Sequence, residues 1–279
     1  MRSLAVALAL FAAPALAQAP PPIPIPQGQA ALAASAVLAG SERPIRSGLV
    51  WRIFEDRDGV APILAAKSTA AEANFTLPPG NYILHAAYGY ASASRRVVLR
   101  PGPEPLRERV AISAGALRIK GVIGDVPIPP ARLTFSVFVP IGNNSEGRLV
   151  LANAQAGEIV RLPEGTYHVV STYGDSNAIM RADLKVEAGQ VTEATLNHRA
   201  ATVTLKLVAA PGGEAFAGTA FSVLTPGGDV IREAIGAFPS VTLAEGEYVL
   251  IARHEGQVHT REFKVESGFD RDVEVVAGP

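Results

Sequence analysis

The side chains best suited to metal binding and to proton transfer near neutral pH are the histidines. The chain has five of them, at His85, His168, His198, His254 and His259. His254 and His259 are the pair that could act together: if residues 255–256 form a two-residue hairpin loop, both imidazoles lie on one sheet face as diagonal neighbours. A zinc site needs three or four ligands, and the sequence does not set the orientation of the nearby Glu255 and Glu262. We therefore expect His254 and His259 to be solvated surface residues, with no metal site and no cofactor.

Groups capable of covalent or acid–base catalysis are present, but without the spacing that catalysis needs. The sequence has no cysteine and no Gly-x-Ser-x-Gly element, which would present a nucleophilic serine. Glu55, Asp56 and Asp58 cluster around Arg57, whereas glycoside hydrolysis requires two carboxylates at a defined separation across a cleft. A solvated charged loop accounts for this cluster. We predict that the protein is not an enzyme and has no catalytic residues; a hydrolase that uses scattered carboxylates is one alternative.

Residues typical of recognition surfaces occur at two corresponding places in the chain. Tyr88 and Tyr90 precede a pair of arginines, and Tyr173 begins a polar run. Tyrosine is enriched at interfaces, and the end loops of a sandwich commonly carry binding residues. The residues predicted to bind a partner are Tyr88, Tyr90, Tyr173, Asp175, Ser176 and Asn177. Packing of the rings within a sheet and ordinary turn chemistry are the alternatives.

Three copies of the pattern Leu-x-x-Gly-x-Tyr organise the chain. They begin at Leu77, Leu162 and Leu243, 85 and 81 residues apart. Each copy is preceded by large apolar residues two apart, and each is followed by a β-rich stretch and an alternating strand that ends in a glycine turn. Matching flanks at near-equal spacing indicate an internal repeat. We expect the glycine to permit a tight turn into a strand and the tyrosine to be buried, with its hydroxyl bonded to the turn backbone as at a tyrosine corner.

Apolar and polar residues alternate with period two between turn signals, as in residues 133–137 and 203–207. This pattern is typical of half-buried antiparallel strands in a sandwich. The Ala-rich segment 29–40 has helix propensity but occupies the position of a first strand. The sequence predicts an all-β protein of three tandem antiparallel β-sandwich domains, at 30–112, 113–199 and 200–279.

The Leu-x-x-Gly-x-Tyr turn followed by a Val-x-x-Gly strand end resembles the repeats of bacterial secreted Ig-like and transthyretin-like (carboxypeptidase regulatory-like) β-sandwich domains. The resemblance covers the second half of each repeat, at about 77–102, 162–189 and 243–268. It implies an adhesion, scaffolding or accessory role, and it carries over no catalytic residues.

The first seventeen residues have the features of a secretory leader. Arg2 supplies a positive charge, residues 4–13 form a short apolar core, and Ala15-Leu16-Ala17 fits the small-x-small site of a signal peptidase. The apolar run is shorter than the roughly 20 residues that span a bilayer. We therefore expect cleavage after Ala17, a Pro-rich linker at 18–29 and a mature periplasmic protein without a transmembrane segment.

Composition narrows the remaining function classes. Charged residues make up 18% of the 279 residues, and the net charge is −1. Nucleic-acid binding needs a clustered basic face, and the longest basic run is Arg95-Arg96. We predict a non-catalytic periplasmic structural or interaction protein that binds an envelope protein or polymer through loops and sheet edges, and no nucleic acid. A small-ligand or carbohydrate-binding module is the main alternative.

Overall fold

Strands make up nearly all of the regular structure. The computed structural model describes residues 25–278, which hold 22 strands and one short 3-10 helix at Pro130–Arg132. The predicted all-β class is therefore confirmed. The predicted leader, residues 1–17, lies outside the described residues. Within the part that the structure describes, no helix is both long and apolar enough to cross a bilayer.

The strands fall into three successive groups, which we call the first, second and third units. The first unit consists of β1 (Ala30–Leu38), β2 (Leu49–Glu55), β3 (Ile63–Ser68), β4 (Ala73–Leu77), β5 (Gly80–Tyr88), β6 (Ala91–Leu99) and β7 (Leu106–Ile112). The second unit consists of β8 (Ala114–Ile123), β9 (Val126–Pro127), β10 (Leu133–Ile141), β11 (Asn144–Gln155), β12 (Ile159–Pro163), β13 (Gly165–Tyr173), β14 (Ile179–Val186) and β15 (Val191–Asn197). The third unit consists of β16 (Ala200–Val208), β17 (Ala220–Leu224), β18 (Val230–Ile235), β19 (Ser240–Ala244), β20 (Gly246–His254), β21 (Gln257–Val265) and β22 (Arg271–Val276).

Each unit contains one three-stranded and one four-stranded sheet in the same strand order. In the first unit these orders are β4-β1-β7 and β3-β2-β5-β6, and the second and third units repeat them. In the second unit the short strand β9 also pairs with β8. The predicted tandem repeat of β-sandwiches is confirmed. The order differs from the ABED and CFG sheets of a constant-type immunoglobulin domain, because the first strand here lies between the fourth and the seventh.

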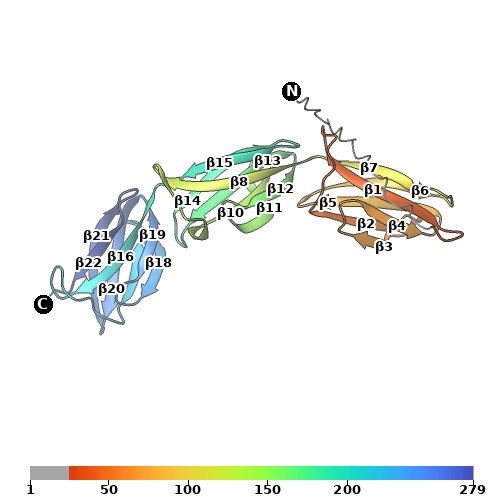
Figure 1. Cartoon of the computed structure of the whole chain (residues 1–279). Helices are drawn as coiled ribbons and strands as arrows, with labels where there is room; N and C mark the ends of the chain where they lie inside the picture. The colour runs from red at the N-terminus through yellow and green to blue at the C-terminus, as the bar shows by residue number, and fades with distance from the viewer. Residues whose placement is uncertain (1–24, 279) are drawn as a thin grey trace, which may run out of the picture.

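One pairing in each unit departs from the antiparallel pattern that we predicted. The first strand runs parallel to the last, in the pairs β1–β7, β8–β15 and β16–β22, and every other pairing in the described sheets is antiparallel. Because these two strands are parallel, the chain enters a unit at one pole and leaves it at the opposite pole. Only Ser113 separates β7 from β8, and only His198 and Arg199 separate β15 from β16. The three units therefore follow one another end to end (Figure 1).

Each unit has its own apolar core, centred on an aromatic residue of its second long strand. Trp51, Phe135 and Phe221 occupy corresponding positions and are at most 1% exposed. In the sequence, each repeat motif is preceded by large apolar residues two apart, and Trp51, Phe135 and Phe221 are the first of these in their repeats. The repeated spacing in the sequence therefore corresponds to a repeated core.

The repeat tyrosines Tyr82, Tyr167 and Tyr248 have the buried position that we predicted. Each hydroxyl donates to the main-chain carbonyl four residues earlier, at 2.9, 2.9 and 2.8 Å. Burial raises the pKa of all three phenols. The motif glycines are the first residues of β5, β13 and β20, and Gly80 and Gly165 hold this position without a left-handed φ. A Cβ on either glycine would instead lie over the tyrosine ring, at 3.5 and 3.8 Å.

Candidate interaction site

The candidate site consists of the loops that join the fifth and sixth long strands of each unit. We call residues 88–90 the first tip, residues 173–178 the second tip and residues 254–256 the third tip. Each tip lies at the C-terminal pole of its unit, since β5, β13 and β20 begin beside the start of the unit's first strand and run away from it. The first and second tips consequently face the next unit. We call these two contacts the first and second junctions.

The first junction is built on the strand β12. The amide of Tyr90 donates to the main-chain carbonyl of Arg161 at 3.0 Å, and the guanidinium carbon of Arg161 lies 4.7 Å from the centre of the Tyr88 ring. This distance is that of a cation–π contact. A Cβ on Gly89 would lie 2.6 Å from the Cβ of Arg161. The contact therefore requires glycine at the centre of the tip.

A groove of about 560 Å³ lies beside the first junction. Its lining comes from the first tip, from the end of β11, from β12 and from the turn between these two strands. It consists of Gly89, Tyr90, Leu151, Ala152, Asn153, Ala154, Gln155, Glu158, Ile159, Val160 and Arg161. Tyr90 is 50% exposed. Asn153 has a φ of 52° at a register shift between β10 and β11, and such bulges commonly re-aim side chains beside functional sites.

The second junction uses the same kind of contact on β19. A Cβ on Gly174 would lie 2.7 Å from the Cβ of Thr242. The side chain of Asn177 donates to the hydroxyl of Tyr248 at 2.9 Å and accepts from the amide of Ala244 at 3.0 Å. Asn177 thereby bonds the residues that form the tyrosine corner of the third unit.

Arg132 adds a second set of bonds across this junction. Its guanidinium donates to the hydroxyls of Thr242 and Thr202 at 2.8 and 3.0 Å, and it lies 4.9 Å from the centre of the Tyr173 ring. An apolar cluster fills the space behind it and joins second-unit residues to Ala200 of the third unit. Among the described residues, the second junction thus has more side-chain hydrogen bonds than the first.

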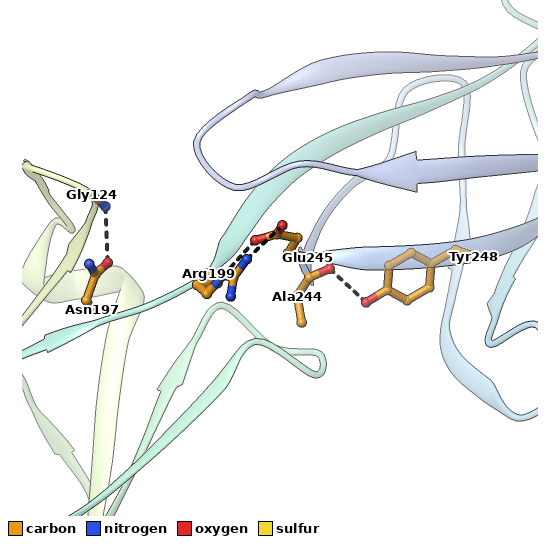
Figure 2. Close-up of polar contacts among 6 residues, drawn as sticks. All are labelled: Gly124, Asn197, Arg199, Ala244, Glu245 and Tyr248. Carbon is orange, nitrogen blue, oxygen red and sulfur yellow. Dashed lines mark hydrogen bonds and ion pairs between the residues drawn. The ribbon is translucent and has the colours of Figure 1, made fainter.

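The short linker of the second junction is also bonded at both ends (Figure 2). The Asn197 side chain accepts from the amide of Gly124 at 3.1 Å. Arg199 forms a two-point ion pair with Glu245, at 2.8 and 3.0 Å. An exposed pair of this kind contributes about 0.2–1 kcal/mol, so its main effect is to hold the direction of the chain.

His198 is the buried titratable group of the second junction. It is 2% exposed, its Nε2 lies 3.0 Å from the hydroxyl oxygen of Ser171, and its ring meets Tyr173 edge-on at 6.2 Å. Burial lowers the pKa of His198 below its ordinary value of 6.5, and a hydrogen bond with the backbone of Ala178 opposes part of this effect. The histidine and serine therefore belong to a packed junction.

Acidification is expected to weaken the second junction through His198. Since its pKa is lowered in the folded chain, the unfolded chain binds more protons, and the free energy of unfolding falls as the pH drops below about 6.5. His198→Gln should flatten the dependence measured by urea denaturation between pH 7 and 5. A residual slope is expected from His85, whose pKa burial also lowers. An unchanged slope would contradict this assignment.

The hairpin at His254 and His259 has the geometry that we predicted. His254 pairs with Gln257 around a two-residue loop, and His259 pairs with Ala252, so both imidazoles lie on one face of the sheet. His254 stacks on Phe216 at 5.2 Å between ring centres. Over residues 25–278, no group of three histidine, aspartate or glutamate side chains is placed to hold a metal ion.

The six residues predicted to bind a partner all lie at the two junctions. Tyr173 is only 5% exposed, Asp175 forms an ion pair with Arg232 at 2.5 Å, and the hydroxyl of Ser176 is buried without a partner. The structure shows polar or cation–π contacts with the next unit for Tyr88, Tyr90, Asp175 and Asn177. The role of all six residues toward another molecule stays a prediction. Sequence reasoning missed Arg132 and Arg161. The sequence contained one sign of the role of Arg161: it stands directly before the repeated leucine, and Thr242 holds the same position in the third repeat.

The chain is similar to proteins with tandem repeats. A family model described as the Rhizobiales growth-associated tandem repeat domain matches residues 202–277, which is most of the third unit. No curated protein sequence matches the chain.

Several solved structures are similar to the chain at low identity. The TIE protein of Bacillus anthracis is 15% identical with a TM-score of 0.27, and the match covers 89% of this chain but only 51% of that one. BcpA, the major pilin subunit of Bacillus cereus, is 11% identical with a TM-score of 0.26, over 90% and 100% of the two chains. The streptococcal ancillary pilin is 13% identical with a TM-score of 0.28, over 89% and 99%. With such scores, the assembly and partners of this chain have to be argued from its own contacts.

Proposed function

We propose that this chain is a non-catalytic structural and interaction protein of the bacterial periplasm. It holds three Ig-like or transthyretin-like β-sandwich domains, at 30–112, 113–199 and 200–279, end to end and binds another protein or an envelope polymer through loops and sheet edges. The observation that carries the proposal is the repeated junction, in which a Tyr-Gly tip of one unit is fitted to a strand of the next. Such a series sets the separation and direction of the surfaces at its two ends.

Tyr90 is the proposed contact with the partner. Of the six predicted residues, Tyr173 is buried and Asn177 is bonded to the third unit. Tyr90 uses its amide for the first junction, while its half-exposed ring lines the groove. An aromatic side chain that is held in place and exposed loses little conformational entropy on binding.

Site-specific photocrosslinking in the native envelope tests this proposal. A photoreactive residue at position 90 should give a discrete adduct. A matched label at Val126, which is 68% exposed beside the end of β8 and outside the groove, should not give that adduct. Identical adducts from both positions, or none from position 90, would contradict the assignment.

A small-ligand or carbohydrate-binding module is the second candidate, and the groove favours it. The groove combines an exposed aromatic ring with the amides of Asn153 and Gln155 and the carboxylate of Glu158, a mixture of groups typical of small-molecule sites. Titration calorimetry with soluble envelope oligosaccharides should then show binding that Tyr90→Ala weakens. An absence of heat with every oligosaccharide would favour a macromolecular partner.

We expect the mature protein to begin at Gln18, because Ala15-Leu16-Ala17 fits a signal-peptidase site. Mass spectrometry of the protein from a periplasmic extract should find this N-terminus. Recovery of the chain with Met1 intact from the cytoplasmic fraction would contradict both the cleavage and the proposed compartment.

A further inference from the structure

The third tip has a residue other than glycine at its first loop position. Glu255 occupies the place of Gly89 and Gly174, and its φ is 47°, compared with 63° and 73° for the two glycines. Residues other than glycine rarely adopt this left-handed region. Glu255 nevertheless does so, and it is followed by a second positive φ, 80° at Gly256, which Tyr90 in the first tip does not have.

The next unit leaves no space for a side chain at the positions of Gly89 and Gly174. A Cβ on Gly89 would lie 2.9 Å from the carbonyl oxygen of Arg161 and 2.6 Å from its Cβ, and a Cβ on Gly174 would lie 2.7 Å from that of Thr242. Carbon atoms that are not bonded to each other make favourable contacts at about 3.5–4.0 Å. A glutamate at this position therefore excludes the kind of docking seen at both junctions.

The first unit has a surface that corresponds in position to those on which the first and second tips dock. Thr76 stands directly before Leu77, as Arg161 and Thr242 stand before the other repeated leucines. Thr76 is exposed, whereas Thr242, which is covered by the second tip, is 4% exposed. The neighbouring tyrosine corner has a bond of 2.9 Å from Tyr82 to Pro78, compared with 2.8 Å for the corner of the third unit.

We propose that the two ends of the chain form a complementary pair for a second copy of this chain, and that Glu255 keeps them apart. The surface around Thr76 accepts a Tyr-Gly tip, and Glu255 prevents the third tip from supplying one. The third tip also has His254 where the other two tips have Tyr88 and Tyr173. This inference goes beyond the proposed function, because it concerns association of the chain with itself and does not depend on another partner.

Sedimentation velocity of the full chain tests the proposal. The wild type should remain a monomer, while the double variant His254→Tyr/Glu255→Gly should reach at least twice the monomer mass as its concentration rises. Adding Thr76→Glu should restore the monomer, since it alters the accepting surface alone. The proposal is wrong if the wild type associates in the same way, if the double variant stays monomeric, or if Thr76→Glu leaves the association unchanged.

A second variant tests the steric argument without any association. Gly174→Glu places the residue of the third tip in the second junction and should detach the third unit, seen as an increased radius of gyration in small-angle scattering. Gly157→Glu is the matched control, because Gly157 also has a positive φ of 84° but a Cβ there would meet nothing within 4 Å. An unchanged radius for Gly174→Glu, or an equal increase for the control, would overturn the proposal.

Discussion

Tyr167→Ala is expected to destabilise the second unit by about 3–5 kcal/mol, the usual range for removing a large buried aromatic side chain. The ring of Tyr167 is 4% exposed within the core, and its hydroxyl bonds the carbonyl of Pro163. The substitution removes the apolar contacts and leaves that carbonyl without its partner. Urea denaturation followed by tyrosine fluorescence or amide exchange should report the loss.

Tyr167→Phe separates the two contributions. It keeps the ring and removes only the hydrogen bond, so the expected loss is about 0.5–1.5 kcal/mol. Gly165→Ala provides a further control, since an added Cβ would meet the tyrosine ring at an ordinary 3.8 Å and should cost little. An unfolding transition unaffected by Tyr167→Ala would show that the repeat tyrosine is not a core element.

Trp51→Ala is expected to have a similarly large effect, about 3–5 kcal/mol, confined to the first unit. Trp51 is fully buried, and its indole N–H donates to the carbonyl of Ala70 at 2.9 Å. If residues 30–112 fold as a separate domain, calorimetry should show one transition moving to lower temperature while the others stay in place.

The control for this prediction is a substitution by phenylalanine, the residue at the corresponding core position of the other two units. Trp51→Phe introduces the side chain found at Phe135 and Phe221, so a smaller loss is expected, from the missing hydrogen bond and the space that the indole vacates. Uniform destabilisation of all three units by Trp51→Ala would contradict the proposed division into separate domains, because the junctions would then couple their unfolding.

The repeated sandwich could be predicted because its signals are local or periodic. Alternation of apolar residues and the Leu-x-x-Gly-x-Tyr pattern both report on the nearby backbone. Segment 29–40 shows the limit of local signals: its alanines favour a helix, yet the structure places Ala30–Leu38 as strand β1 between β4 and β7. Ala30, Ala34 and Ala36 are at most 1% exposed, so the strand is closely covered at these positions and small side chains suit it.

The parallel pairing and the junctions could not be predicted, because they join distant residues. Strand β1 meets β7 only after five other strands have folded back, and no periodicity encodes that order. Asn177 and Tyr248, 71 residues apart, bond across the second junction. Sequence reasoning found the residue types of the tips but expected them to face solvent, since it had no information that the next unit covers them.

The parallel pairing of first and last strands determines how a unit responds to tension along the chain. A pull on its two ends draws β1 and β7 in opposite directions along their common axis, past a run of pairs from Leu32–Leu106 to Leu38–Ile112. All of these inter-strand bonds are then loaded together in shear, and none can be opened alone, as happens when a hairpin is peeled apart. The same arrangement in β8–β15 and β16–β22 gives every unit in the series this resistance to stretching.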